Sequence, residues 1–137
     1  MLQRPKHLQV AALCYKVSDN KTQVLLITSR DTGRWIIPKG WPEQGLTTRE
    51  AAIKEAWEEA GVVAEPEHGD TIGSYSYDKI QSTGWPLPVE TLVYPVAVDT
   101  LADDFPEAHE RKRKWVDPEE AANLVNEPEL KSILRNL

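Results

Sequence analysis

Three glutamates, Glu55, Glu58 and Glu59, stand within five positions of one predicted helix. Successive helical residues are about 100° apart, so the three carboxylates fall within a sector of about 100° on one face. Glu55 and Glu59 are like charges four positions apart, and Glu58 and Glu59 are near the helix end where the backbone dipole disfavours anions. Oxygen ligands suit Mg²⁺ or Mn²⁺, so a bound divalent cation would reverse this unfavourable arrangement. The alternative is a solvated acidic face that Lys54 partly screens from the i−4 position of Glu58.

The helix that carries these glutamates is predicted over residues 48–60. Thr47 and Glu50 have the spacing of a capping box, in which each side chain accepts a hydrogen bond from a free N–H group. Gly61 suits the left-handed residue that follows the last helical turn. Alanines at positions 51, 52, 56 and 60 favour helix as well. The side opposite the carboxylates is apolar and is expected to pack on a sheet through Ile53, Ala56, Trp57 and Ala60.

The rest of the chain alternates between β-prone segments and turn residues, which predicts one domain over residues 1–137. The fold class is α+β, a mixed sheet with helices packed against it. Strands are predicted over 8–17, 22–30, 34–38, 71–80, 90–100 and 113–116. Loops are predicted over 39–45, 81–88 and 103–110, and two more helices over 117–125 and 127–137, each beginning near a proline.

Composition limits the possible partners. The net charge is −6, from 16 basic and 22 acidic residues, which disfavours nonspecific nucleic-acid binding. No apolar run approaches the roughly 20 residues that span a membrane, and the first residues lack the features of a signal peptide. Cys14 is the one cysteine, and it lies in an apolar run, so we expect a buried residue rather than a nucleophile. A lone thiol fits a reducing compartment, and a cytoplasmic location is predicted.

Residues 40–62, GWPEQGLTTREAAIKEAWEEAGV, resemble the Nudix box, G-x5-E-x7-R-E-U-x-E-E-x-G-U, where U is aliphatic. Two positions depart from the pattern in charge or geometry: Lys54 replaces an arginine and loses its bidentate fork, and Leu46 replaces the first glutamate. Ala56 is small rather than aliphatic. The matching residues are Gly40, Glu55, Glu58, Glu59, Gly61 and Val62.

Segments outside the box extend the resemblance over most of the chain. AALCYK, VLLITSR, RWIIPKG and RKRKWVDPEEA are similar to the diphosphoinositol polyphosphate phosphohydrolase branch, and PKG is also similar to dinucleoside polyphosphate hydrolases. The resemblance implies a Nudix fold, an α/β/α sandwich with a mixed central sheet. It also implies metal-dependent cleavage of a phosphoanhydride bond in a diadenosine polyphosphate or a diphosphoinositol polyphosphate. The alternatives are hydrolysis of nucleoside diphosphate sugars, ADP-ribose or RNA 5′ ends, or a degenerate binding module, for which Leu46 is the best support.

The resemblance further implies a set of metal ligands. Glu55, Glu58 and Glu59 would hold Mg²⁺ or Mn²⁺ together with the backbone carbonyl of Lys39, and Glu55 or Glu58 would act as general base. Loops late in the chain often add another carboxylate in this family. The candidates here are Glu107 and Glu110.

A basic run, HERKRKW over residues 109–115, is the main candidate for holding phosphates. Taken alone, such a run indicates a solvated surface. Beside a metal site, Arg111 and Arg113 could bind phosphates bidentately. Other substrate-binding candidates are Arg34, Lys39, Ser29 and Arg30. Among the aromatic residues, Trp35 and Trp115 are predicted in the core, whereas Trp41 and Trp85 lie in loops and could either pack or stack on a base.

Overall fold

The computed structural model of the chain describes residues 7–67 and 69–137, and its central layer is a mixed β-sheet. In the described residues the sheet has eight strands, and three helices lie against it. The strands are β1 (His7–Ser18), β2 (Lys21–Thr28), β3 (Trp35–Ile36), β4 (Lys39–Gly40), β5 (Val62–Ala64), β6 (Gly73–Ile80), β7 (Pro86–Leu101) and β8 (Arg113–Val116). The helices are α1 (Thr48–Ala60), α2 (Pro118–Leu124) and α3 (Pro128–Arg135).

The two longest strands, β1 and β7, lie parallel at the centre of the sheet. On the other edge of β1, β2 pairs with residues 15–18 and β4 pairs with residues 10–11, both antiparallel. The strands β3 and β8 pair with β2, and β5 and β6 pair with β7. The mixed sheet that the sequence predicts is therefore confirmed.

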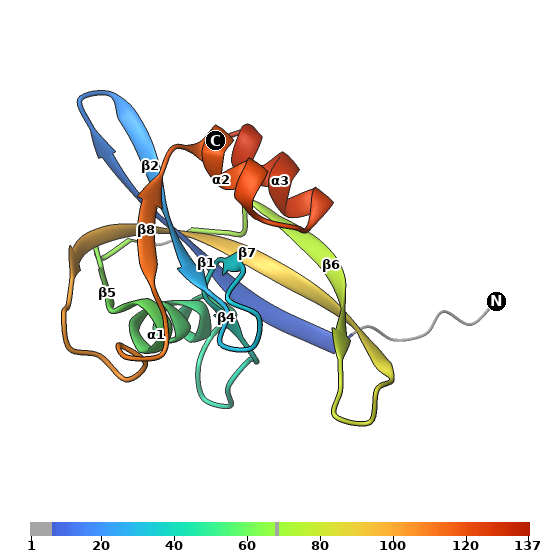
Figure 1. The fold of residues 1–137 in the computed structure, drawn as a ribbon. Helices are drawn as coiled ribbons and strands as arrows, with labels where there is room; N and C mark the ends of the chain where they lie inside the picture. Colours follow the sequence, from blue (N-terminus) through green and yellow to red (C-terminus); the bar gives the residue numbers. More distant parts are fainter. Residues whose placement is uncertain (1–6, 68) are drawn as a thin grey trace.

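The helices cover the sheet on both faces (Figure 1). Alternate residues of β1 point into two separate cores, Val10 and Cys14 toward α1 and Leu13 toward α2 and α3. Because β1 is buried on both faces, it is almost continuously apolar. The predicted α/β/α arrangement is confirmed, and within the described residues no helix is long and apolar enough to cross a membrane.

Helix α1 begins and ends where its sequence predicts. The N–H of Glu50 donates to the Thr47 hydroxyl at 3.1 Å, the N–H of Thr47 donates to the Glu50 carboxylate at 2.8 Å, and Gly61 is left-handed. The prediction that Trp57 packs on the sheet is wrong, because its side chain is 38% exposed. The helix instead turns Ala56 and Glu59 inward, and Trp57 follows Ala56 by about 100° and so points away.

Four strands differ clearly from the prediction, and the first is β3, which keeps only Trp35–Ile36 of the predicted 34–38. Strands β4 and β5 have two and three residues, too few to produce a periodic signal, and they form only because β1 and β7 supply partners. Strand β7 begins at Pro86 rather than at residue 90. Prolines indicate loops, yet here they lie where β7 pairs with β6 at the end of a long hairpin.

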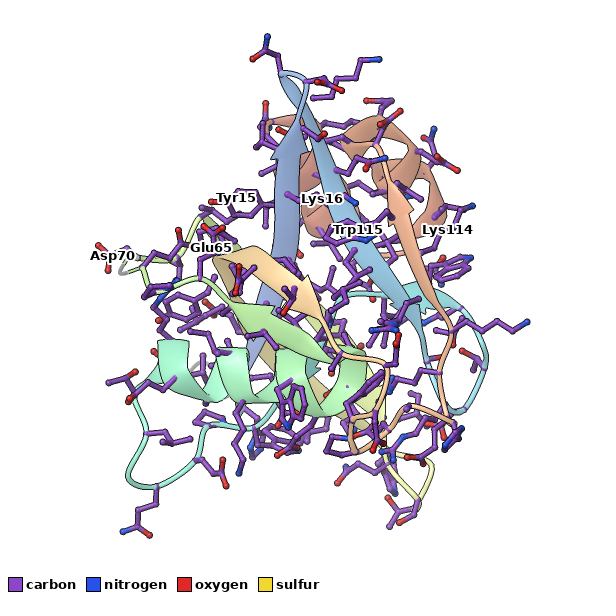
Figure 2. The ribbon with its side chains drawn as sticks, turned by 90° about the vertical axis from the view of Figure 1, so that its left-hand side faces the viewer. Tyr15, Lys16, Glu65, Asp70, Lys114 and Trp115 are labelled. Carbon is purple, nitrogen blue, oxygen red and sulfur yellow. The ribbon has the colours of Figure 1, made fainter. Side chains whose placement is uncertain are left out.

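Cys14, Trp35 and Trp115 were predicted to lie in the core, and their burial can be compared with that prediction. Cys14 is fully buried, as predicted, and burial raises the pKa of its thiol to about 12. Trp35 and Trp115 pack against the two cores but remain partly exposed. The Lys16 ammonium lies 4.3 Å from the centre of the Trp115 ring, and Figure 2 shows the two side chains together. Such cation–π contacts stabilise an indole at the edge of a core.

Gly61 and Gly33 give a matched test of the packing at the end of α1, because both have a φ of +69°. A Cβ on Gly61 would lie 2.5 Å from the Phe105 ring, whereas a Cβ on Gly33 meets nothing within 4 Å. We expect Gly33→Ala to lower the free energy of unfolding by about 1 kcal/mol, the cost of a left-handed alanine. Gly61→Ala should lower it by a further ~1–3 kcal/mol through overpacking. Urea denaturation measures both, and equal losses would contradict this role of Phe105.

Candidate active site

Helix α1 meets β4 so closely that only glycine fits at position 40. A Cβ on Gly40 would lie 2.3 Å from the carboxyl carbon of Glu55 and 2.4 Å from its Oε1. Real side chains do not tolerate such distances, so the absence of a side chain at Gly40 makes room for this carboxylate. The first glycine of the motif and its second glutamate position therefore meet in space, although they are 15 positions apart in the chain.

Glu59 lies next to Glu55, in the interface between α1 and β4. Glu59 is only 5% exposed, and its carboxylate accepts a hydrogen bond from the backbone N–H of Lys39 at 3.3 Å. Burial and a hydrogen bond with the Glu55 carboxyl raise the pKa of Glu59 to about 9, and the nearby Arg111 opposes this rise. The raised pKa reflects how unfavourable a negative charge on Glu59 is in this buried place beside Glu55.

Arg111 connects this acidic pair to the rest of the site. Its side chain is 7% exposed, and Nη2 lies 3.6 Å from the Glu59 carboxylate. Its Nε donates to the Glu107 carboxylate at 2.8 Å, and Nη1 donates to the backbone carbonyl of Thr28 at 3.1 Å. One guanidinium thus fixes two acidic residues relative to the end of β2.

These acidic residues line a cleft of about 310 Å³, which is called the carboxylate cleft below. Four cationic side chains line it, together with Gln9, Ser29 and Trp41. Burial lowers the pKa of Lys39, and the Glu59 carboxylate opposes that shift. The charged lining residues are Asp31, Glu55, Glu59 and Glu107, and Arg30, Lys39, Lys79 and Arg111. Acidic and basic side chains therefore lie side by side in the carboxylate cleft.

A second hollow of about 370 Å³ shares Ser29, Arg30 and Arg111 with the carboxylate cleft. It is lined further by Thr28, Gly33, His109, Glu110 and Lys112. The structure thus places Glu107 in the cleft and Glu110 in the adjoining hollow, where its carboxylate is 3.4 Å from Arg30. Of the two late-loop carboxylates that the sequence suggests, Glu107 is the one that meets Glu59 through a shared arginine.

The structure does not bring Glu58 into the cleft. Its side chain is 32% exposed and lies 3.6 Å from the ammonium of Lys54, which in turn contacts Glu43 at 2.7 Å. The sequence spacing correctly predicted the angles between the three glutamates around the axis of α1. However, the close approach of α1 to β4 selects Glu55 and Glu59, which leaves Glu58 on the outer side.

Two predicted phosphate ligands are engaged elsewhere. Arg34 makes two hydrogen bonds to the buried Glu127 at 2.9 and 3.4 Å, near α3. Arg113 donates to the backbone carbonyls of Ala60 and Ala102 at 3.0 and 2.8 Å, and its guanidinium lies over a phenylalanine ring. Neither side chain lines the carboxylate cleft or the adjoining hollow. Arg111 and Arg113 do not act together, because Arg111 lies in the loop before β8 whereas Arg113 is the first residue of the strand.

Four residues of the cleft were not predicted as site residues: Gln9, Asp31, Ile36 and Lys79. Gln9 is a buried polar residue in the apolar strand β1, and its side-chain oxygen accepts a hydrogen bond from the Tyr77 hydroxyl. A lone polar residue in a buried strand is the signal that could have indicated it. Lys79 lies on β6, far along the chain from the motif, and gives no such signal.

The donor set fits a hard divalent cation. Within residues 7–67 and 69–137, no three His, Cys, Asp or Glu side chains lie close enough together to form a metal site as they stand. Glu55 and Glu59 nevertheless supply adjacent carboxylate oxygens, and Arg111 and the backbone N–H of Lys39 partly offset their repulsion. Oxygen donors of this kind are those that Mg²⁺ and Mn²⁺ prefer.

Residues 7–137 match the NUDIX domain family, and the chain belongs to that family. It is 34% identical over 121 residues to Nudix hydrolase 16, mitochondrial, of Arabidopsis thaliana, covering 82% of this chain and 63% of that protein. It is 31% identical over 120 residues to human diphosphoinositol polyphosphate phosphohydrolase 3-beta, covering 85% and 68%. The chain spans only 62% and 53% of the Arabidopsis relatives Nudix hydrolase 17, mitochondrial, and Nudix hydrolase 21, chloroplastic.

Solved structures show the same fold. The C. elegans Ap4A hydrolase superposes with a TM-score of 0.62 at 24% identity, covering 96% of this chain and 95% of that one. The NUDIX domain of Shewanella oneidensis NrtR, solved with ADP ribose, gives a TM-score of 0.68 at 17% identity, covering 98% and 89%. The Nudix resemblance and the Nudix fold that the sequence predicts are both confirmed.

Arg111 and Arg30 give a matched pair for testing the arginine that connects the acids. Both contact Glu107, but the Arg30 side chain is 54% exposed. We expect Arg111→Met to lower the free energy of unfolding by about 3 kcal/mol, because it leaves buried acids without their cation. Arg30→Met should cost less than about 1 kcal/mol, since exposed ion pairs contribute little. Urea denaturation in EDTA measures the difference, and similar losses for both variants would argue against this role of Arg111.

Proposed function

We propose that this chain is a Mg²⁺- or Mn²⁺-dependent pyrophosphohydrolase that cleaves a phosphoanhydride bond in a highly phosphorylated small molecule. The observation that carries the proposal is the carboxylate cleft, where the adjacent Glu55 and Glu59 lie beside Lys39 and Arg111. Phosphoanhydride hydrolysis needs positioned phosphates, compensation of their charge and an oriented water, rather than covalent chemistry. Membership of the NUDIX family and the names of the relatives support this reaction class.

Glu55 and Glu59 would hold the cation, with the backbone carbonyl of Lys39 as a further ligand. When bound, the cation supplies Lewis acidity and compensates the negative charge of the phosphates. Arg111 orients the Glu59 carboxylate and keeps Glu107 beside it. Glu58 is the remaining ligand candidate, and it would have to leave Lys54 to take part.

Glu55 is the general base in this proposal. Glu55 lines the cleft, whereas the alternative, Glu58, faces Lys54 outside it. A base must lie within hydrogen-bond reach of the proton that it accepts. The Glu55 carboxylate would take that proton from the attacking water, and Gly40 provides the space in which this carboxylate lies.

The phosphates would bind along the cationic side of the cleft and extend into the adjoining hollow. Ser29, Arg30 and Arg111 line both spaces, and the hollow adds Lys112. A phosphate chain is long enough to occupy both, which supports a substrate with several phosphates in series. The names of two relatives, a diphosphoinositol polyphosphate phosphohydrolase and an Ap4A hydrolase, support the same class. A cytoplasmic location stays a prediction, since Nudix hydrolase 16 of Arabidopsis has a mitochondrial name.

The leading rival is a binding module that has lost catalysis. Its support is Leu46, in place of the first glutamate of the motif, and the NrtR NUDIX domain that was solved with ADP ribose. However, Leu46 is exposed and does not line the carboxylate cleft. The substitution therefore leaves the acidic residues of the cleft in place, which favours the enzymatic proposal.

Hydrolysis of a defined panel tests the activity. The panel contains diadenosine tetraphosphate, 5-diphosphoinositol pentakisphosphate, ADP-ribose, UDP-glucose and 5′-triphosphorylated RNA, each with Mg²⁺, and chromatography measures the products. We expect one of the first two to be preferred, and Glu55→Gln to lower kcat by about 10²- to 10⁴-fold through loss of the base. Glu43→Gln, outside the cleft, is the matched control and should retain activity. Full activity of the Glu55→Gln variant would refute the assignment of the base.

Thermal unfolding with Mn²⁺ tests the cation site without any turnover. A ligand at 100 times its Kd stabilises a protein by about 2.7 kcal/mol, which should raise the Tm of this chain by several degrees. The combined Glu55→Gln and Glu59→Gln variant should lose this rise, because it lacks both carboxylates. Glu43→Gln should keep it. If the doubly substituted variant responds to Mn²⁺ as strongly as the wild type does, the cation binds elsewhere.

A further inference from the structure

Trp41 presents an indole ring at the wall of the carboxylate cleft. It is 43% exposed, and it lines the cleft together with Lys39, Gly40 and Glu55. The other tryptophans of the described chain differ in their surroundings. Lysine ammonium groups lie over the rings of Trp35 and Trp115, and Trp57 and Trp85 do not line the cleft. No ring or cation contact of this kind covers Trp41 among the described residues.

The backbone holds Trp41 in place. The preceding residues, Lys39 and Gly40, pair with β1, and Pro42 follows directly. A residue before proline is restricted to extended conformations, so little backbone freedom remains. An indole has only two side-chain torsions to fix. A rigid aromatic surface of this kind loses little entropy when a flat ligand stacks on it.

The other lining groups offer little apolar surface to Trp41, which is 43% exposed. The cleft is otherwise lined mainly by charged and polar groups, which hold ions and phosphates rather than apolar surface. A nucleobase has a π-face that stacks on tryptophan. An inositol ring has no π-system, and the phosphates around it are ions that an indole does not bind. Trp41 therefore distinguishes between the two substrate classes that the phosphate-binding residues alone leave open.

We propose that Trp41 stacks on the base of a nucleoside polyphosphate, so that the preferred substrate is a dinucleoside polyphosphate and not a diphosphoinositol polyphosphate. This inference rests on the proposed pyrophosphohydrolase function. The phosphate chain lies along Arg30 and Lys39, and one base lies on the indole at the side of β4. The second nucleoside extends beyond the cleft, which leaves the scissile anhydride beside the Glu55 and Glu59 carboxylates.

The test compares kcat/KM for diadenosine tetraphosphate with kcat/KM for inorganic tripolyphosphate, which has no aromatic group. Loss of one stacked base lowers binding by about 10- to 100-fold. We expect Trp41→Ala to reduce kcat/KM for diadenosine tetraphosphate at least tenfold more than for tripolyphosphate. Trp41→Phe keeps a ring and should recover most of the loss, whereas Trp41→Leu keeps only the apolar volume and should not.

Trp85→Ala is the matched control, because Trp85 is 74% exposed and lies outside the cleft. It should retain the wild-type preference between the two substrates. Calorimetric titration with ADP supplies a readout that needs no hydrolysis, and Trp41→Ala should weaken ADP binding by about 10- to 100-fold. Urea denaturation of Trp41→Leu establishes that any loss does not arise from unfolding.

The outcomes separate this inference from the proposed function. If Trp41→Ala reduces both substrates equally and leaves the affinity for ADP unchanged, the stacking site is refuted while the hydrolase function stands. If no member of the substrate panel is hydrolysed but ADP binding depends on Trp41, the hydrolase function is refuted and the aromatic site stands. Hydrolysis of 5-diphosphoinositol pentakisphosphate in preference to diadenosine tetraphosphate would overturn the assignment of the substrate class.

Discussion

The close contact between α1 and β4 is the constraint on which the rest of the site depends. Small residues make this contact possible: the inner face of α1 is mostly alanine, and β4 presents Gly40 to it. Two glutamates on α1 are thereby held against the strand, and one of them, Glu59, is buried. Larger side chains at either surface would move the helix outward and return both carboxylates to solvent. The packing that stabilises the fold and the proximity that the chemistry needs have the same physical origin.

Burying acidic residues requires cations, and the loop before β8 supplies them. Arg111 contacts Glu59 and Glu107, and two residues later Arg113 binds the carbonyls of Ala60 and Ala102. Arg111 compensates the negative charge of Glu59 and Glu107, and Arg113 fixes the loop to the end of α1. A carbonyl at a helix end has no partner within the helix, so this second contact also satisfies groups that would otherwise lack hydrogen bonds. The two arginines therefore have different tasks although they are nearly adjacent in sequence.

The sequence predicted what local chemistry determines. The bounds of α1 follow from the capping box and Gly61, and the shared direction of Glu55 and Glu59 follows from helical spacing. Spacing gives relative angles only, so it could not tell which face of α1 meets the sheet, and it misplaced Trp57. The partner of a cation is likewise a tertiary property: Arg34 binds Glu127, which is 93 residues away in the chain. Gln9 and Lys79 enter the site through strand pairing, which the Nudix motif does not contain.

The proposed substrate is an anion, and the chain has a net charge of −6, so its recognition has to be local. Charges separated by more than about 10 Å are largely screened at physiological salt, so the four cationic and four acidic side chains that line the carboxylate cleft set the field inside it. In the proposed function, these cations would bind a phosphate chain without distinguishing the groups attached to it. Selectivity between substrates therefore requires a side chain that recognises an uncharged part of the substrate. Trp41, which follows β4 and precedes Pro42, is the aromatic side chain among those lining the cleft. If it stacks on a base as proposed, phosphate binding and the choice of substrate belong to separate parts of one site.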